Sequence, residues 1–186
     1  MRKPKNYFPG VMKITAAASA GITLALWRIY CRCPRPWIFA AAISCGTTCY
    51  HFSMRLLVGL VVPRLFAAAD PARKWFQPKA FEPGLYRFLK IKKWKKYVPT
   101  YAPDTFSMNQ PPERIARTMC ISELVHLVIV PLSFLPLLLA VPFGEFPVFL
   151  TTSLIAAGID CVFILLQRYN RPRVLRLLAK RRPDNE

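Results

Sequence analysis

The chain has 186 residues, 54% of them hydrophobic, and 27 Lys and Arg residues against 9 Asp and Glu residues give it a net charge of +18. This composition is too apolar for an ordinary soluble domain and too highly charged for a chain that lies wholly in lipid. The two properties are compatible if the charge is confined to loops and tails, and residues 118–167 contain no Lys or Arg at all.

Four apolar stretches approach or exceed the length of about 20 residues that a helix needs to cross a bilayer. They are residues 11–27, 37–62, 118–141 and 146–166. Basic residues mark cytoplasmic loops, so we expect the loop 63–117, the basic tail 167–186 and both termini on the cytoplasmic side. Arg28, Arg32 and Arg35 would then face outward, which leaves open whether residues 11–27 form a true span. The sequence predicts an all-α integral membrane protein with a single membrane domain, residues 1–186.

The loop 63–117 is basic and rich in proline, so it cannot form one long helix. Its segment FEPGLYRFLKIKKWKKYV (81–98) carries apolar residues on two nearly opposite helix faces, which favours a short interfacial helix followed by a bend. Lysines interleaved with tryptophan are typical of a segment that binds anionic headgroups. The same pattern is found in proteins that bind single-stranded nucleic acid. Next to four spans we expect the membrane surface and no nucleic acid, and a merely solvated charge run is the simplest alternative.

Five charged or histidine residues interrupt the last three predicted spans, where a charge costs at least about 2.5–3.5 kcal/mol and usually marks a functional site. They are His51, Arg55, Glu123, His126 and Asp160. Counted at about 1.5 Å per helical residue, all five are expected in the cytoplasmic half of the membrane. The predicted topology therefore places them in one polar cleft that opens to the cytoplasm.

A histidine beside a carboxylate can act as a general base toward a hydroxyl group. We expect His126 to take this role, with Glu123 or Asp160 as the orienting carboxylate and His51 as the second candidate. Arg55 would bind a substrate carboxylate, phosphate or oxyanion, or would pair with Asp160 or Glu123 only to hold the helices together. Cys45 and Cys49 share a helix face near His51, but their spacing is not that of a usual zinc site and no metal is expected.

The last span runs directly into Gln167-Arg168-Tyr169-Asn170-Arg171-Pro172-Arg173. Pro172 is expected to end or kink the helix. Arginine clusters at a membrane surface recognise anionic headgroups, phosphate or coenzyme A. A stop-transfer cluster is the alternative, although it would not need the Gln, Tyr, Asn and Pro residues.

Three segments, LYRFLKIKKWKKYVP (85–99), ISELVH (121–126) and QRYNRPR (167–173), resemble the glycosyl-4,4'-diaponeurosporenoate acyltransferase family, and the resemblance extends over most of residues 45–175. It implies a bacterial membrane enzyme that esterifies a fatty acyl chain onto the sugar of a glycosylated carotenoid, the closing step of staphyloxanthin synthesis. The positions that match the family's motifs are Lys93, Trp94, Lys95, Glu123, His126, Gln167, Arg168, Asn170 and Arg171.

We therefore expect a multi-pass membrane acyltransferase that acts on a glycosylated isoprenoid, carotenoid or related glycolipid. Substrate-binding residues are expected at Arg55, in the loop and at the end of the last span, including Arg173. No cofactor is expected; acyl-CoA or another activated donor is the co-substrate, and the partners are membrane lipids and a lipid-linked sugar. The alternatives are a membrane methyltransferase of the isoprenylcysteine type and a non-enzymatic accessory protein.

Overall fold

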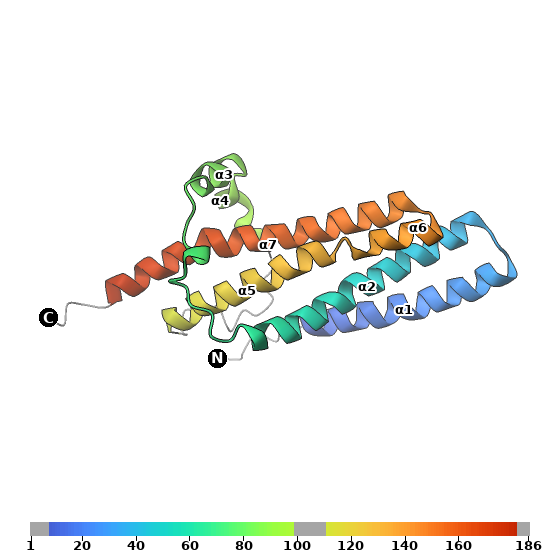
Figure 1. The fold of residues 1–186 in the computed structure, drawn as a ribbon, viewed down its shortest axis with the longest axis horizontal. Helices are drawn as coiled ribbons and strands as arrows, with labels where there is room; N and C mark the ends of the chain where they lie inside the picture. Colours follow the sequence, from blue (N-terminus) through green and yellow to red (C-terminus); the bar gives the residue numbers. More distant parts are fainter. Residues whose placement is uncertain (1–7, 99–110, 182–186) are drawn as a thin grey trace. The chain divides into compact units, whose positions relative to one another are not determined.

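The computed structural model describes residues 8–98 and 111–181. These residues form helices joined by turns and short loops, without strands (Figure 1). Its long helices are α1 (Phe8–Arg32), α2 (Pro36–Leu65), α5 (Pro112–Leu132) and α7 (Phe146–Arg181). Within this part of the chain, four segments are long and apolar enough to cross a membrane: Pro9–Arg32, Pro36–Leu65, Glu113–Phe143 and Phe146–Arg176. The prediction of an all-α membrane protein is confirmed.

Prolines shape the long helices without always ending them. Pro131 lies near the end of α5, and the chain continues as the 3₁₀ helix η3 (Leu135–Leu139) and the short α6 (Ala140–Phe143). A turn with positive φ at Gly144 and Glu145 then leads into α7. Pro172, expected to end or kink the last helix, does not end it, because α7 continues through it to Arg181; the kink stays a prediction. A proline removes only one helix hydrogen bond, and side-chain contacts described below hold α7 on the N-terminal side of Pro172.

The loop 63–117 contains short helices, in keeping with its prolines. They are η1 (Lys74–Phe76), α3 (Glu82–Phe88), α4 (Ile91–Trp94) and η2 (Lys95–Tyr97). Lys90 separates α3 from α4 and has a left-handed backbone conformation, with φ of 51°. The predicted short helix followed by a bend is therefore confirmed. Residues 99–110 of this loop and 182–186 of the tail lie outside the described residues.

The chain divides into two compact units. Of the described residues, the first unit, which we call the loop unit, contains 62–98, 111–126 and 162–181. The second, the bundle unit, contains 8–61 and 127–161. The helices α2, α5 and α7 contribute residues to both units.

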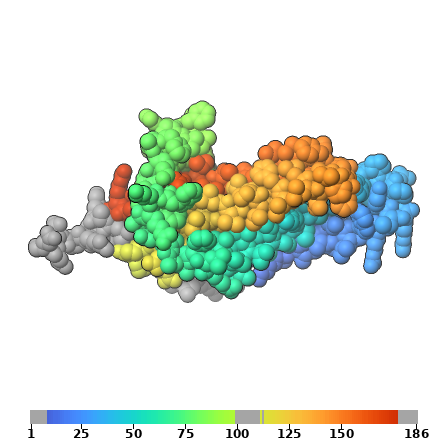
Figure 2. All heavy atoms as spheres, viewed as in Figure 1, coloured from blue at the N-terminus to red at the C-terminus, as the bar shows by residue number. Residues whose placement is uncertain are grey.

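The loop unit has a small apolar core between the segment after α2 and helix α5. Figure 2 shows the outer face of this region, with the segment after α2 in green beside α5 in yellow. Ala69, Phe76 and Cys120 are buried there, and Ile121 and Leu124 pack against them. Burial of these side chains holds η1 beside α5, which brings the polar groups of the loop to the helix surface.

The bundle unit is held by aromatic contacts and by long-range hydrogen bonds, one of them from Tyr50. The rings of Trp27 and Tyr30 on α1 lie 6.3 and 5.1 Å from that of Phe39 on α2. The Tyr50 hydroxyl donates to the Leu132 carbonyl at 2.8 Å. Such a bond satisfies the one polar atom of a tyrosine that otherwise packs among apolar groups.

Candidate functional site

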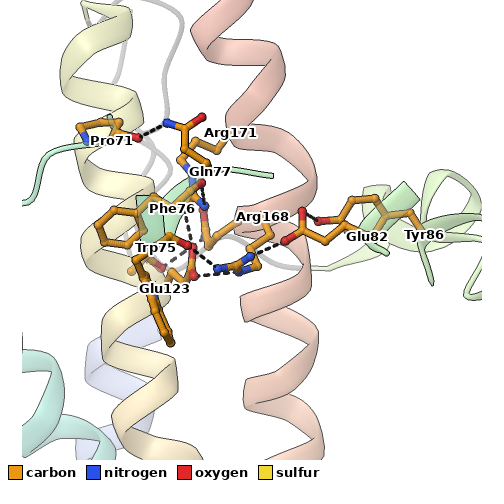
Figure 3. Close-up of polar contacts among 11 residues, drawn as sticks. Pro71, Trp75, Phe76, Gln77, Glu82, Tyr86, Glu123, Arg168 and Arg171 are labelled. Carbon is orange, nitrogen blue, oxygen red and sulfur yellow. Dashed lines mark hydrogen bonds and ion pairs between the residues drawn. The ribbon is translucent and has the colours of Figure 1, made fainter. Parts of the chain in front are cut away.

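Glu123 is the centre of a buried ion-pair network in the loop unit (Figure 3). Its side chain, on α5, is fully buried, and each carboxylate oxygen accepts a hydrogen bond from a different arginine of α7. Arg168 Nε lies 2.9 Å from Oε1 and Arg171 Nη1 lies 2.5 Å from Oε2. The two arginines are three residues apart, so they project from the same face of α7. Both carboxylate oxygens of Glu123 are thus bound to α7.

The same arginines continue into the loop. Arg168 Nη1 pairs with Glu82 at the start of α3, and its Nη2 donates to the Trp75 carbonyl at 2.8 Å. Arg171 Nη2 donates to the Phe76 carbonyl at 2.6 Å, and its guanidinium lies 5.1 Å from the centre of the Phe76 ring. Two backbone carbonyls of η1 are therefore satisfied by α7, which attaches the loop to the helices (Figure 3).

Glu82 extends the network to a tyrosine. The carboxylate is 3% exposed, and its second oxygen accepts a hydrogen bond from the Tyr86 hydroxyl at 2.9 Å. Burial raises the pKa of Tyr86, and the hydrogen bond to Glu82 raises it further. Tyr86 therefore stays protonated and remains a donor to Glu82 at physiological pH.

The network contains two carboxylates, Glu82 and Glu123, and two guanidinium groups, Arg168 and Arg171, so its formal charges cancel. Buried charges are tolerated when they are paired and hydrogen-bonded in this way. Arg171 is only 1% exposed, and Arg168 already has two acidic partners. The charges of these two arginines are consequently matched inside the protein.

His126 lies one helical turn beyond Ser122 on the same face of α5. Its half-buried imidazole stacks on the Phe163 ring of α7, with centroids 4.8 Å apart and planes 11° from parallel. Ser122 Oγ accepts a hydrogen bond from Gln167 Nε2 at 3.2 Å. The contact surface of α5 and α7 therefore carries an imidazole, a hydroxyl and an amide within about two helical turns.

Three of the remaining predicted binding residues of the loop unit, Lys95, Asn170 and Arg173, lie around Tyr169. Lys95 and Arg173 both contact its ring, and Lys95 also donates to Asn170. Trp94 donates its indole N–H to the Leu89 carbonyl at 2.8 Å, which stabilises the bend between α3 and α4. Lys93 is exposed on α4.

An apolar pocket of about 360 Å³ borders the network on the side of η1. Its lining is Leu65, Phe66, Ala68, Ala69, Arg73, Trp75, Phe76 and Leu124. Arg73 is the one charged side chain among these lining residues. The volume is at the small end of the range of about 300–1,000 Å³ that is usual for ligand pockets.

The bundle unit contains a second polar group. Arg55 of α2 pairs with Asp160 of α7, and its guanidinium also donates to the Ala156 carbonyl at 3.0 Å and the His51 carbonyl at 3.1 Å. The His51 side chain is 6% exposed, and neither ring nitrogen has a hydrogen-bond partner among the described residues. Arg55 thus joins two helices, whereas the His51 ring keeps its hydrogen-bonding capacity.

The structure brings the predicted site residues together in two groups, one in each unit. The loop unit holds Lys93, Trp94, Lys95, Glu123, His126, Gln167, Arg168, Asn170, Arg171 and Arg173, and the bundle unit holds His51, Arg55 and Asp160. That both groups line one cleft stays a prediction. No three or more His, Cys, Asp and Glu side chains among residues 8–98 and 111–181 are arranged to hold a metal ion.

Sequence reasoning missed Glu82, Tyr86, Tyr169, Phe163 and the two carbonyls of η1. One signal for Glu82 was present, since it is the only acidic residue between Asp70 and Asp104 in a strongly basic segment. An acid that is retained among so many cations is a candidate for a specific pair. The carbonyl partners and the aromatic contacts have no comparable signature in the sequence.

A family model described as glycosyl-4,4'-diaponeurosporenoate acyltransferase matches residues 72–180, which is more than half of the chain. The matched region contains the whole ion-pair network, His126 and the residues around Tyr169, whereas His51 and Arg55 precede it. No curated protein and no solved structure matches the chain.

Proposed function

Because the chain belongs to the glycosyl-4,4'-diaponeurosporenoate acyltransferase family, we propose that it transfers a fatty acyl chain to a sugar hydroxyl of a lipid. The acceptor is a glycosylated isoprenoid, such as a glycosylated carotenoid, or a related glycolipid in a bacterial cell membrane. The donor is an activated acyl compound such as acyl-CoA. The family match carries this proposal, and the four apolar helices agree with a substrate that resides in the bilayer.

In the proposed reaction, a sugar hydroxyl attacks the carbonyl carbon of the acyl donor. The hydroxyl proton passes to a base, the new C–O ester bond forms, and the C–S bond of the thioester breaks. The departing thiolate then takes up the proton. A general base contributes about 10²–10⁴-fold to reactions of this kind.

We assign the general base to His126. Two observations support the assignment: the imidazole is held by its stacking on Phe163, and it lies on the face of α5 that carries the Ser122–Gln167 hydrogen bond. A fixed ring orientation favours proton transfer because the accepting nitrogen need not be ordered again in each cycle. His51 remains the second candidate for this role.

Glu123 has a different role in this proposal. Its two oxygens accept hydrogen bonds from Arg168 and Arg171, so we treat it as a positioning residue that holds the loop against α5 and α7. Arg168 and Arg171 act through the same network. Arg55 and Asp160 hold α2 to α7 through their ion pair.

We further assign the apolar pocket beside η1 to part of a hydrocarbon chain of the substrates. Its lining is apolar apart from Arg73, and it lies beside Leu65 at the end of a candidate span. Leu124→Trp should fill this pocket and shift the product toward shorter acyl chains. An unchanged chain-length distribution in the variant would refute the assignment of this pocket to a hydrocarbon chain.

The experiment that tests the function uses purified protein in lipid nanodiscs with radiolabelled acyl-CoA and a glycosylated carotenoid. Wild type should form a labelled ester of the glycoside. The chain has two histidines, so His126→Ala and His51→Ala form a matched pair. His126→Ala should lower kcat by about 10²–10⁴-fold, while His51→Ala should retain most activity.

Each other outcome corrects a separate part of the proposal. Loss of activity in His51→Ala alone would move the base to His51, and full activity in both variants would exclude a histidine base. If the wild-type protein forms no acyl ester, the function itself is wrong. Labelling of a lipid from S-adenosylmethionine would instead favour a methyltransferase.

A further inference from the structure

Two cations of the loop unit share one aromatic ring at the end of α7. The Arg173 guanidinium lies 4.2 Å from the centre of the Tyr169 ring, and the Lys95 ammonium lies 5.0 Å from it. Arg173 follows Tyr169 by one helical turn, whereas Lys95 comes from η2, 74 residues earlier in the chain. The fold therefore brings together two positive charges that are distant in sequence.

Each cation is oriented by a polar partner as well as by the ring. Arg173 Nη2 donates to the Tyr169 hydroxyl at 2.7 Å, and Lys95 Nζ donates to Asn170 Oδ1 at 3.3 Å. Tyr169 is itself held by the edge of the Tyr86 ring, at a centroid distance of 5.2 Å. Tyr86 in turn donates to Glu82, so the buried network supports the ring that supports the cations.

These two cations differ from Arg168 and Arg171 in having no acidic partner among the described residues. The ion pairs found there join Arg168 and Arg171 to Glu82 and Glu123, and Arg55 to Asp160, and none includes Lys95 or Arg173. A guanidinium has five N–H donors and an ammonium has three. Most of these donors stay available, and two like charges near one ring repel each other unless an anion lies between them.

We propose that Lys95 and Arg173, held on Tyr169, form a binding site for a phosphate group. A phosphate group carries one or two negative charges that offset those of the pair, and its several oxygen atoms can accept hydrogen bonds from both cations. Arg173 lies in the last turn of the candidate span Phe146–Arg176, and lipid headgroups are expected at the end of a span. The phosphate therefore belongs either to coenzyme A of the acyl donor or to a phospholipid headgroup, and the first source rests on the proposed function.

The test compares the two sources with purified full-length protein. Coenzyme A is titrated against protein in neutral phosphatidylcholine nanodiscs and followed by calorimetry. Retention of phosphatidylglycerol is measured separately by native mass spectrometry. The variants are Arg173→Gln, Lys95→Gln and Tyr169→Phe, which removes the hydroxyl that anchors Arg173 but keeps the ring. The matched controls are Arg176→Gln on α7 and Lys74→Gln on η1, two exposed cations outside the site.

Arg173→Gln and Lys95→Gln should each weaken binding by about 10- to 100-fold, the usual effect of losing a charge-assisted hydrogen bond. Tyr169→Phe should have a smaller effect, and the controls should change binding less than about twofold. Loss of coenzyme A binding identifies the donor as the source, and loss of phosphatidylglycerol retention alone identifies the lipid. If both ligands bind these variants as they bind the controls, the site is refuted.

The same variants separate this inference from the proposed function. A wild-type protein that forms no acyl ester but loses phosphate binding in Arg173→Gln would refute the function and retain the site. A protein with full acyl transfer and unchanged phosphate binding in the variants would refute the site and retain the function. Thermal unfolding of each variant identifies any that fail to fold.

Discussion

Glu123→Gln tests the ion-pair network most severely, because it removes one charge and leaves the shape of the side chain nearly unchanged. In the wild-type protein, the carboxylate accepts one hydrogen bond from Arg168 and one from Arg171. Arg168 keeps Glu82 as a partner in the variant, but Arg171, which is 1% exposed, loses its acidic partner. Breaking a buried pair in this way costs about 3–5 kcal/mol.

For a chain of this length, about 1 kcal/mol corresponds to roughly 2–4 °C in Tm, so Glu123→Gln should lower Tm by roughly 6–20 °C. Thermal unfolding in mild detergent measures the shift. Glu113→Gln is the matched control, since Glu113 is an exposed residue in the first turn of the same helix. The control variant Glu113→Gln should lose less than about 1 kcal/mol of unfolding free energy.

The double variant Glu123→Met with Arg171→Met sharpens the test. Replacement of a buried ion pair by apolar residues of similar volume is often neutral, so the double variant should recover most of the loss. A Tm for Glu123→Gln equal to that of Glu113→Gln would refute the reasoning. If the stability losses of the single variants Glu123→Met and Arg171→Met simply add in the double variant, the two side chains do not interact.

Three further predictions concern other parts of the molecule. Burial and the bond to Glu82 raise the pKa of Tyr86 above its ordinary value of 10.0, so the neutral phenol stabilises the fold below pH 10 and this stabilisation is lost as the pH rises further. Tyr86→Phe should flatten the fall of Tm in that alkaline range, and an unchanged slope would contradict the assignment. Ser153 is fully buried and its Oγ has no partner in the part of the chain that the structure describes, whereas Ser133 Oγ donates to the Ile129 carbonyl at 2.9 Å. Ser133→Ala should therefore cost about 0.5–1.5 kcal/mol and Ser153→Ala little or nothing, and equal losses of stability would be inconsistent with these contacts. Cys31 and Cys33 are exposed and Cys120 is buried, so an impermeant maleimide applied to intact cells should label the first two if residues 28–35 face outward; labelling only after permeabilisation would invert the predicted topology.

The helices and the family could be predicted from the sequence because both depend on local pattern. Apolar stretches define the spans, and proline and the two apolar faces of residues 81–98 predict a short helix and a bend. Pro172 shows the limit of local rules, since α7 continues past a residue that usually ends a helix, with the contacts of Arg168 and Arg171 just before it.

The partners within the site could not be predicted in the same way. Glu123 and His126 share a helix with i, i+3 spacing, which suggested that they act as a pair. The structure instead directs both Glu123 oxygens to residues 45 and 48 positions later in the chain. Such pairs depend on how α5 and α7 pack, and sequence spacing carries no information about contacts between helices. The distinction between Arg171, which is buried and paired, and Arg173, which is exposed, is likewise visible only in the fold.

Acyl transfer by purified protein tests the central claim most directly. Wild-type protein in nanodiscs, supplied with labelled acyl-CoA and a glycosylated carotenoid, should produce a carotenoid glycoside esterified on its sugar, and His126→Ala should abolish this product while remaining folded. An intact wild-type protein that forms no such ester, or a His126→Ala variant that forms it at the wild-type rate, would contradict the account.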